Sequence, residues 1–116
     1  LIAHGSPVDP LNEYVHLDTH KNLFEYYFDR YNSQIIGLGH THVPFKYEFN
    51  NRIIFNPGSI GQPRDGSPDS SYSILDLSVI PTISLLKIKY NVNHSADKIL
   101  RANLPESFAY RLYNGT

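Results

Sequence analysis

Two apolar runs in this chain each end directly at a segment of glycine and histidine, and this arrangement constrains the fold more than any other sequence feature. Leu1 to Ala3 leads into His4 and Gly5, and Gln34 to Leu38 leads into Gly39-His40-Thr41-His42. Short apolar runs bounded by glycine or proline are typical of buried strands. Because ligands gather beyond the carboxyl ends of strands in open α/β sheets, we expect the histidines to share one site.

The segment between the two runs predicts a helix. Asp18 or Thr19 can act as its N-cap, and we expect it to span about residues 19 to 32. Its apolar residues recur at intervals of three and four, so they form one face: Leu23, Phe24, Tyr27, Phe28 and Tyr31. This face is expected to pack in the core.

The second half of the chain predicts mostly antiparallel strands. Asn50 and Asn51 tolerate the positive φ of a tight hairpin turn. Ser95 or Asp97 can cap a final helix, which Pro105 would end. The expected elements are strands at 45–49, 52–55, 72–77 and 83–90, a loop at 56–70 and a helix at 96–103. The fold class is therefore α/β with two helices.

Composition excludes several classes of function. The net charge of -1 and pI near 6.6 leave no basic excess for structural nucleic-acid binding. The chain has no cysteine, so thiolate metal sites and cysteine nucleophiles are excluded, and no apolar run is long enough to span a membrane. We expect a cytoplasmic protein. Because methionine is absent and the chain opens on an apolar strand-like run, we also expect a segment of a longer protein.

The histidines are the strongest candidates for chemistry. Neutral imidazole suits Mn, Fe, Zn, Co or Ni better than Ca or Mg. His40 and His42 would share a face on an extended segment, or diverge towards two metals on a turn. His16 and His20 are separated by the expected helix N-terminus, and His94 precedes a helix, so these three are weaker candidates.

The motifs resemble a known family. His4-Gly5, Gly39 to His42 and Asn56-Pro57-Gly58-Ser59 are similar, in order and spacing, to the last three blocks of calcineurin-like metallophosphoesterases. The continuation from Ile60 to Gly66, followed by Ser71-Tyr72, resembles the small bacterial and archaeal branch that includes YfcE-type phosphodiesterases. The resemblance implies that residues 1–116 form the C-terminal portion of a single domain with a four-layer α-β-β-α sandwich.

The resemblance also implies roles for residues. His4 and His40 would bind one metal of a pair, and His42 would bind the other. The loop from Asn56 to Ser59 would lie beside the site with backbone N–H groups on the phosphate side. Expected substrate contacts are Asn56, Gly58, Ser59 and Arg64. The implied reaction is phosphate-ester hydrolysis by a water that bridges two divalent transition metals, without a catalytic protein nucleophile.

Three further blocks of the family are not recognised in this chain: a D-x-H block, a G-D block with the bridging aspartate, and a G-N-H block with an asparagine ligand and the general-acid histidine. The aspartates of the chain, including Asp18 in Asp18-Thr19-His20, do not sit in such contexts. We therefore expect the 116 residues to be inactive alone and to need the N-terminal half of the domain for hydrolysis.

Two other functions remain open from the sequence. One is a catalytically silent protein-binding scaffold with the same fold, and the other is a small histidine-only metal-binding module. For the enzyme, the expected partner is a phosphorylated small molecule, a nucleotide or a phosphoprotein, and the sequence also allows a homo-oligomer. The residues around the metals do not select among these substrates.

Overall fold

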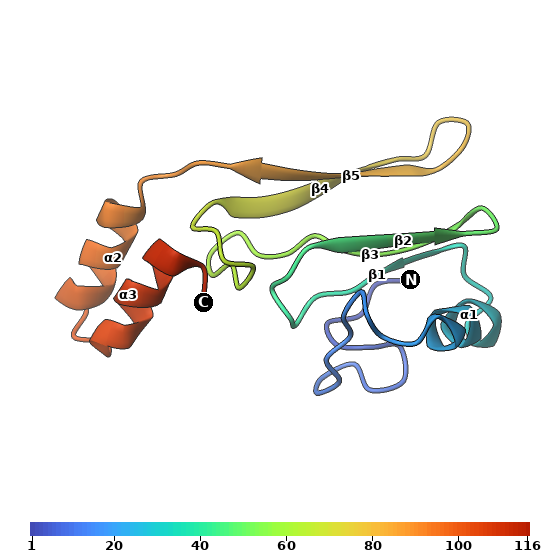
Figure 1. Cartoon of the computed structure of the whole chain (residues 1–116), viewed down its shortest axis with the longest axis horizontal. Coiled ribbons are helices and arrows are strands. Elements are labelled where there is room, and N and C mark those ends of the chain that lie inside the picture. Colours follow the sequence, from blue (N-terminus) through green and yellow to red (C-terminus); the bar gives the residue numbers. More distant parts are fainter.

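The computed structural model describes residues 1–116 as an elongated α/β molecule of 47 × 29 × 20 Å (Figure 1). Its elements in chain order are α1 Lys21–Arg30, β1 Ile35–Gly37, β2 Phe45–Phe49, β3 Arg52–Asn56, β4 Ser70–Asp76, β5 Thr82–Ile88, α2 Val92–Arg101 and α3 Glu106–Asn114. The α/β class predicted from the sequence is confirmed. None of these helices is long and apolar enough to cross a membrane.

The first sheet has the strand order β1-β3-β2. β3 is central, parallel to β1 and antiparallel to β2, and β2 and β3 form the hairpin predicted around Asn50 and Asn51. Both asparagines have positive φ, as a tight turn requires. The first residues of the chain run parallel to β1 through a bridge between Ile2 and Gly37. Three parallel segments therefore end at the same edge.

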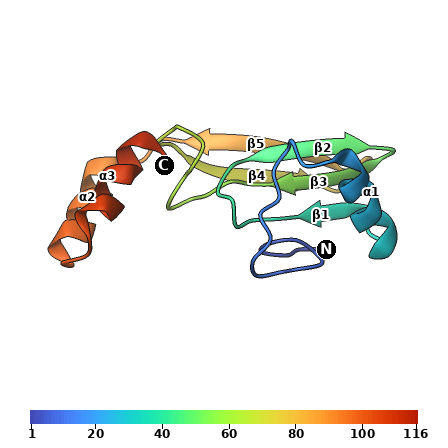
Figure 2. The ribbon, with the colours of Figure 1, turned by 60° about the horizontal axis from the view of Figure 1, so that its bottom comes forward.

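Side chains on the two faces of β3 belong to two separate hydrophobic cores. Ile54 faces α1 and packs with Phe24, Tyr27 and Phe28, whereas Ile53 and Phe55 face the opposite side and pack against Ile83 of β5. Successive side chains of a strand point to opposite faces, so one strand can contribute to both cores. Figure 1 shows the resulting order, with the first sheet between α1 and the β4–β5 sheet, and Figure 2 views the same strands from the side of α1.

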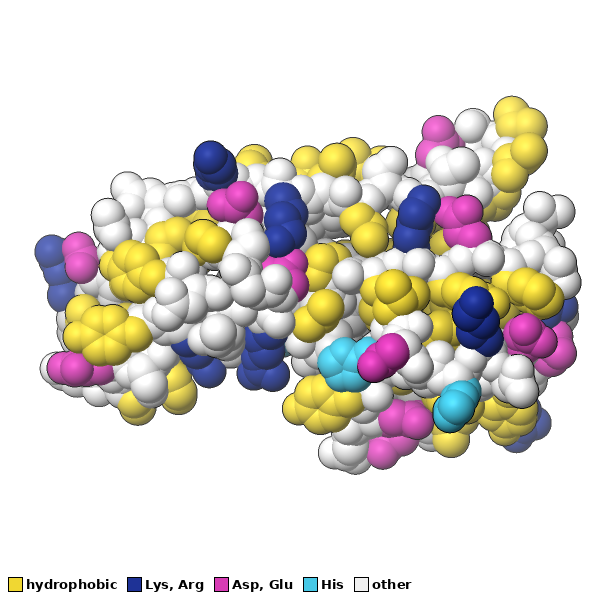
Figure 3. Space-filling view, in the orientation of Figure 1, with side chains coloured by type: hydrophobic (Ala, Val, Ile, Leu, Met, Phe, Trp, Pro, Cys, Tyr) yellow, Lys and Arg dark blue, Asp and Glu magenta, His cyan; other side chains and the backbone are white.

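The second sheet consists of β4 and β5 paired antiparallel, in the region where two strands were predicted. Among its apolar residues only Ile83 is buried. Exposed apolar side chains on this hairpin include Ile74, Leu77, Val79, Ile80 and Ile88. Figure 3 shows hydrophobic side chains at the tip of the hairpin. The first sheet, packed on both faces, is therefore the better-buried part of the molecule.

Several expected boundaries and one burial prediction are wrong. Helix α1 begins after His20, with no side-chain cap from Asp18 or Thr19, and α2 begins after Asn91, whose side chain accepts a hydrogen bond from His94 N–H at 2.9 Å. Helix α2 ends at Arg101, and Pro105, which was expected to end it, is instead the N-cap of α3, a helix that the sequence did not predict. The first strand was expected to be buried, yet Leu1 and Ile2 are 47% and 77% exposed.

The buried Tyr27 predicts a loss of stability at high pH. Its hydroxyl donates to the Glu13 carboxylate at 3.2 Å, and burial raises the pKa of Tyr27 to about 12 from its ordinary value of 10.0. The folded state thus favours the neutral phenol. The contribution of Tyr27 to the free energy of unfolding is complete below pH 10 and is lost as the pH rises from 10 towards 12.

We expect Tyr27→Phe to flatten the decline in the free energy of unfolding above pH 10. Urea unfolding of the full-length protein from about pH 8 to about pH 11.5 measures it, because this range spans the ordinary tyrosine pKa of 10.0. Tyr110→Phe, at an exposed position of α3, is the matched control. Equal declines in both variants would contradict the role of Tyr27.

Candidate functional site

His4 and His40 face each other at the edge where the parallel segments end. The Gly39 N–H donates to the His4 carbonyl at 2.9 Å, which holds the two chain segments side by side. The His4 Nε2 and His40 Nδ1 atoms are 2.9 Å apart. At this distance two imidazole nitrogens either share one proton or direct both lone pairs at a common cation. The ring of Tyr14 packs on His40, with centroids 3.9 Å apart.

His42 points to a different neighbour. Its Nδ1 lies 2.7 Å from the Gln62 carbonyl oxygen. Because a carbonyl can only accept, Nδ1 carries the proton and Nε2 keeps its lone pair. Such a fixed tautomer is the usual arrangement of a metal-binding histidine. The site residue that sequence reasoning missed is therefore Gln62, which acts through its backbone and so has no side-chain signal.

The sequence left open whether His40 and His42 lie on an extended segment or on a turn, and the backbone angles show a turn. His40 and His42 both adopt left-handed φ values, 63° and 60°, while Thr41 between them is buried. The segment is thus a turn that directs Thr41 inward and gives the histidine rings different neighbours. Left-handed backbone at a non-glycine residue costs on the order of 1 kcal/mol or more and is common at functional sites.

Asn56 joins the histidine turn to the loop that follows β3. Its side-chain amide donates to the Gly39 carbonyl at 2.6 Å and to the Thr41 hydroxyl at 3.0 Å. Its side-chain oxygen accepts from Gly58 N–H at 2.8 Å. Asn56 itself is fully buried. Its side chain therefore positions both loops and does not reach the surface where a substrate would bind.

The loop after Asn56 lines the site, but its N–H groups already donate hydrogen bonds within the protein. Gly58 N–H is bonded to Asn56, and Ser59 N–H donates to the Ser71 hydroxyl at 2.8 Å. The expectation that these two N–H groups face the phosphate side is therefore wrong. Gly58 and Ser59 nevertheless form the wall of a cleft of about 510 Å³ whose lining also includes His4, His40 and His42.

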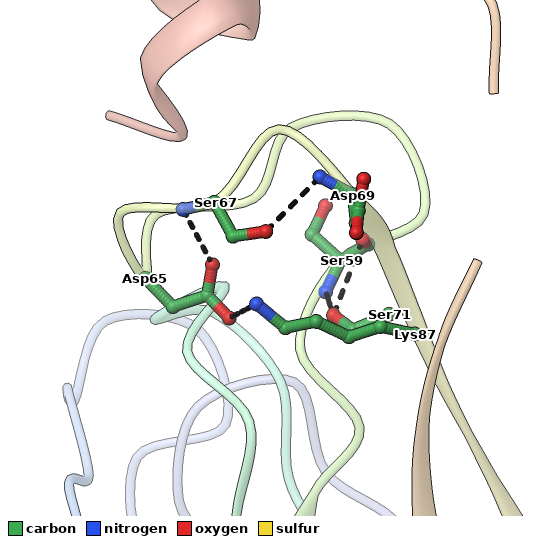
Figure 4. A network of polar contacts seen from close by, with 6 residues as sticks. All are labelled: Ser59, Asp65, Ser67, Asp69, Ser71 and Lys87. Carbon is green, nitrogen blue, oxygen red and sulfur yellow. Dashed lines mark hydrogen bonds and ion pairs between the residues drawn. The ribbon is translucent and has the colours of Figure 1, made fainter. Parts of the chain in front are cut away.

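Arg64 lies farther along the same loop. Its backbone N–H donates to the His42 carbonyl at 3.2 Å, but its side chain is exposed and does not line the cleft. The next residue, Asp65, pairs with Lys87 of β5 at 2.7 Å and accepts from Ser67 N–H (Figure 4). These contacts fasten the loop to the second sheet. A substrate contact by Arg64 stays a prediction.

The donor set fits part of a metal centre. Ring nitrogens bind Zn at about 2.0 to 2.1 Å, so two of them on one ion lie about 2.9 Å apart at right angles and about 3.3 Å apart at the tetrahedral angle. The 2.9 Å between the His4 and His40 nitrogens is close enough for both to bind one ion, and it is also the length of a hydrogen bond. No group of three or more His, Cys, Asp or Glu side chains comes together. The histidines therefore form no complete metal-binding donor set by themselves.

Comparison with known families identifies the superfamily to which the chain belongs. The family model of the calcineurin-like phosphoesterase superfamily domain matches residues 1–79. The chain belongs to this superfamily. Members of the superfamily generally use divalent metals, and the matched residues include every histidine that lines the cleft.

Relatives of this calcineurin-like chain agree with that assignment. The uncharacterized protein MJ0912 of Methanocaldococcus jannaschii is 29% identical over 99% of the chain and 51% of its own length. Phosphodiesterase YfcE of Escherichia coli is 38% identical over 46% of the chain and 28% of its own length. The chain thus spans about half the length of MJ0912 and less of YfcE.

Solved structures show the same calcineurin-like fold. A metallophosphoesterase from Sphaerobacter thermophilus matches with a TM-score of 0.86 and 28% identity, over 99% of this chain and 54% of the other. The hypothetical protein PH1004 from Pyrococcus horikoshii matches with a TM-score of 0.85 and 21% identity, over 99% and 46%. The latter supports the fold alone.

Gly58 allows a direct test of the cleft wall. It has a φ of 83°, and an added Cβ would overlap the Ser71 hydroxyl. Gly66 has a similar φ of 78° but open space around the added Cβ. Gly66→Ala should therefore cost about 1 kcal/mol for the left-handed backbone, and Gly58→Ala should cost at least about 2 kcal/mol more because of the overlap. Urea unfolding of the full-length protein measures both, and equal losses would refute this packing.

Proposed function

We propose that the full-length protein is a phosphoesterase with two divalent transition metals, and that this chain contributes His4, His40 and His42 to their binding. His4 and His40 would hold one metal and His42 the other. The observation that carries the proposal is the meeting of His4 Nε2 and His40 Nδ1 at 2.9 Å in a cleft that His42 also lines. Superfamily membership and the similarity to a phosphodiesterase support it.

The protein groups have distinct roles in this proposal. The Gln62 carbonyl keeps the His42 Nε2 lone pair available, and buried Asn56 holds the two loops in register. Gly58 and Ser59 would contact the substrate from the cleft wall, and Arg64 would approach it from the loop. Divalent cations bound here would supply Lewis-acid stabilisation of charge on the phosphoryl group.

The proposal specifies the class of metal and the class of substrate. Imidazole ligands favour Mn, Fe, Zn, Co or Ni. The substrate would be a phosphorylated small molecule, a nucleotide or a phosphoprotein, cleaved as a monoester or diester. We propose that residues 1–116 are the C-terminal portion of one catalytic domain and are inactive alone, because the D-x-H, G-D and G-N-H blocks of the family are not recognised in them.

Hydrolysis of bis(p-nitrophenyl) phosphate with Mn²⁺ by the full-length protein tests the proposal. We expect the His40→Ala, His42→Ala double variant to lose at least about 100-fold in kcat/KM, since losing even an outer-shell partner of a metal ligand costs about 10- to 100-fold. His94→Ala, at an exposed position in α2, should retain full activity.

Parallel assays with p-nitrophenyl phosphate would separate monoesterase from diesterase activity. A wild-type rate no higher than that of the double variant on both substrates would overturn the proposal. That result would favour the catalytically silent scaffold with the same fold.

A further inference from the structure

The C-terminal helical pair lies outside the residues that the family model matches, yet α3 reaches the loop that holds His42. The Gly66 N–H donates to the Gly115 carbonyl at 3.1 Å. Gly115 has a left-handed φ of 63°, and an added Cβ would overlap the Ser67 backbone. The end of α3 is therefore docked closely on the 62–67 segment, beside the C-terminus in Figure 1.

Arg111 of α3 makes the contact that leads towards the site. Its Nη2 donates to the Gln62 side-chain oxygen at 3.0 Å, and its guanidinium lies 4.5 Å from the centroid of the Phe108 ring. The Phe108 contact limits where the guanidinium can lie. Both Arg111 Nε and Gln62 Nε2 are buried without a hydrogen-bond partner.

Gln62 is held at three points. Its side chain accepts from Arg111, its N–H donates to the Ser59 hydroxyl at 3.0 Å, and its carbonyl accepts from His42 Nδ1 at 2.7 Å. The N–H and side-chain contacts hold the Gln62 Cα in place, and the following Pro63 restricts the ψ angle that sets the direction of the carbonyl. The contacts run without a break from α3 to the His42 ring.

We propose that Arg111 is a positioning residue for His42, acting through Gln62. By holding the Gln62 carbonyl against Nδ1, α3 selects the His42 tautomer whose Nε2 lone pair faces the metal. The inference rests on the proposed role of His42 as a metal ligand. It assigns to the C-terminal helical pair a part in assembling the site.

The test compares Arg111→Met with Arg101→Met in the full-length protein. Arg101 lies exposed at the end of α2 and serves as the matched control. Long-range ¹H–¹⁵N NMR of the metal-free protein at pH 8 reports which His42 nitrogen carries the proton, and calorimetry with Zn²⁺ reports metal affinity. We expect Arg111→Met to reduce the Nδ1-protonated fraction and to weaken Zn²⁺ binding about tenfold. Arg101→Met should change neither.

Two further variants separate positioning from general stability. Arg111→Lys keeps a donor for Gln62 and should restore part of the Nδ1-protonated fraction. Gln62→Ala removes the shared link, so combining it with Arg111→Met should weaken Zn²⁺ binding no more than either change alone. Additive losses, or a loss in Arg111→Met with an unchanged His42 tautomer, would overturn the inference.

Failure of the proposed function gives a different result. A wild-type protein that hydrolyses no phosphate ester would reject the phosphoesterase activity, but the tautomer measurement would still decide whether Arg111 positions His42. Conversely, an active protein whose Arg111→Met and Arg101→Met variants behave alike would reject only the positioning role.

Discussion

The candidate site depends on the buried side chain of Asn56. The amide group of this one residue bonds to Gly39 and Thr41 on one loop, while its oxygen accepts from Gly58 on another. Without Asn56, the Gly39 carbonyl and the Gly58 N–H would need water as their hydrogen-bond partner. Because a buried amide is costly unless all its hydrogen bonds are made, the loops have little freedom to separate. The positions of the histidine turn and the cleft wall are consequences of that constraint.

The alternation of side chains in β3 places Asn56 where it can do this. Ile54 packs under α1, and Ile53 and Phe55 pack towards β5, so the strand is fixed on both faces up to its last residue. The parallel β1 and the segment that precedes His4 end at the same edge. Strand direction therefore brings together residues that are far apart in the sequence, as expected for ligand sites in α/β sheets.

Much of this was predictable from local patterns. The apolar spacing around Phe24 and Phe28 indicated α1, and Asn50-Asn51 indicated the hairpin, because both signals arise from neighbouring residues. The capping residues were harder to predict, since several polar side chains near a helix start compete for that position. Helix α3 was missed because a proline can either follow the end of a helix or stand at the start of one, and Pro105 does the latter.

The exposure of Ile2 was also missed. An apolar run indicates that a strand is suited to burial, but burial requires other residues to cover it, and within residues 1–116 none covers this side chain. The role expected of the site loop changed for a different reason. The Asn56 side chain accepts from the Gly58 N–H two residues on, an Asx turn that the local Asn-Pro-Gly sequence favours, so this N–H is not free for a substrate.

By itself, the sequence determined the α/β class, the order of most elements, the superfamily and the three histidines that line the cleft, because these follow from short apolar periods and compact motifs. Only the tertiary structure decided that His40 and His42 lie on a left-handed turn, that His4 meets His40, and that Gln62 orients His42. These are contacts between distant segments or through backbone atoms. No local residue pattern encodes them, since they form only when packing brings the strand ends together.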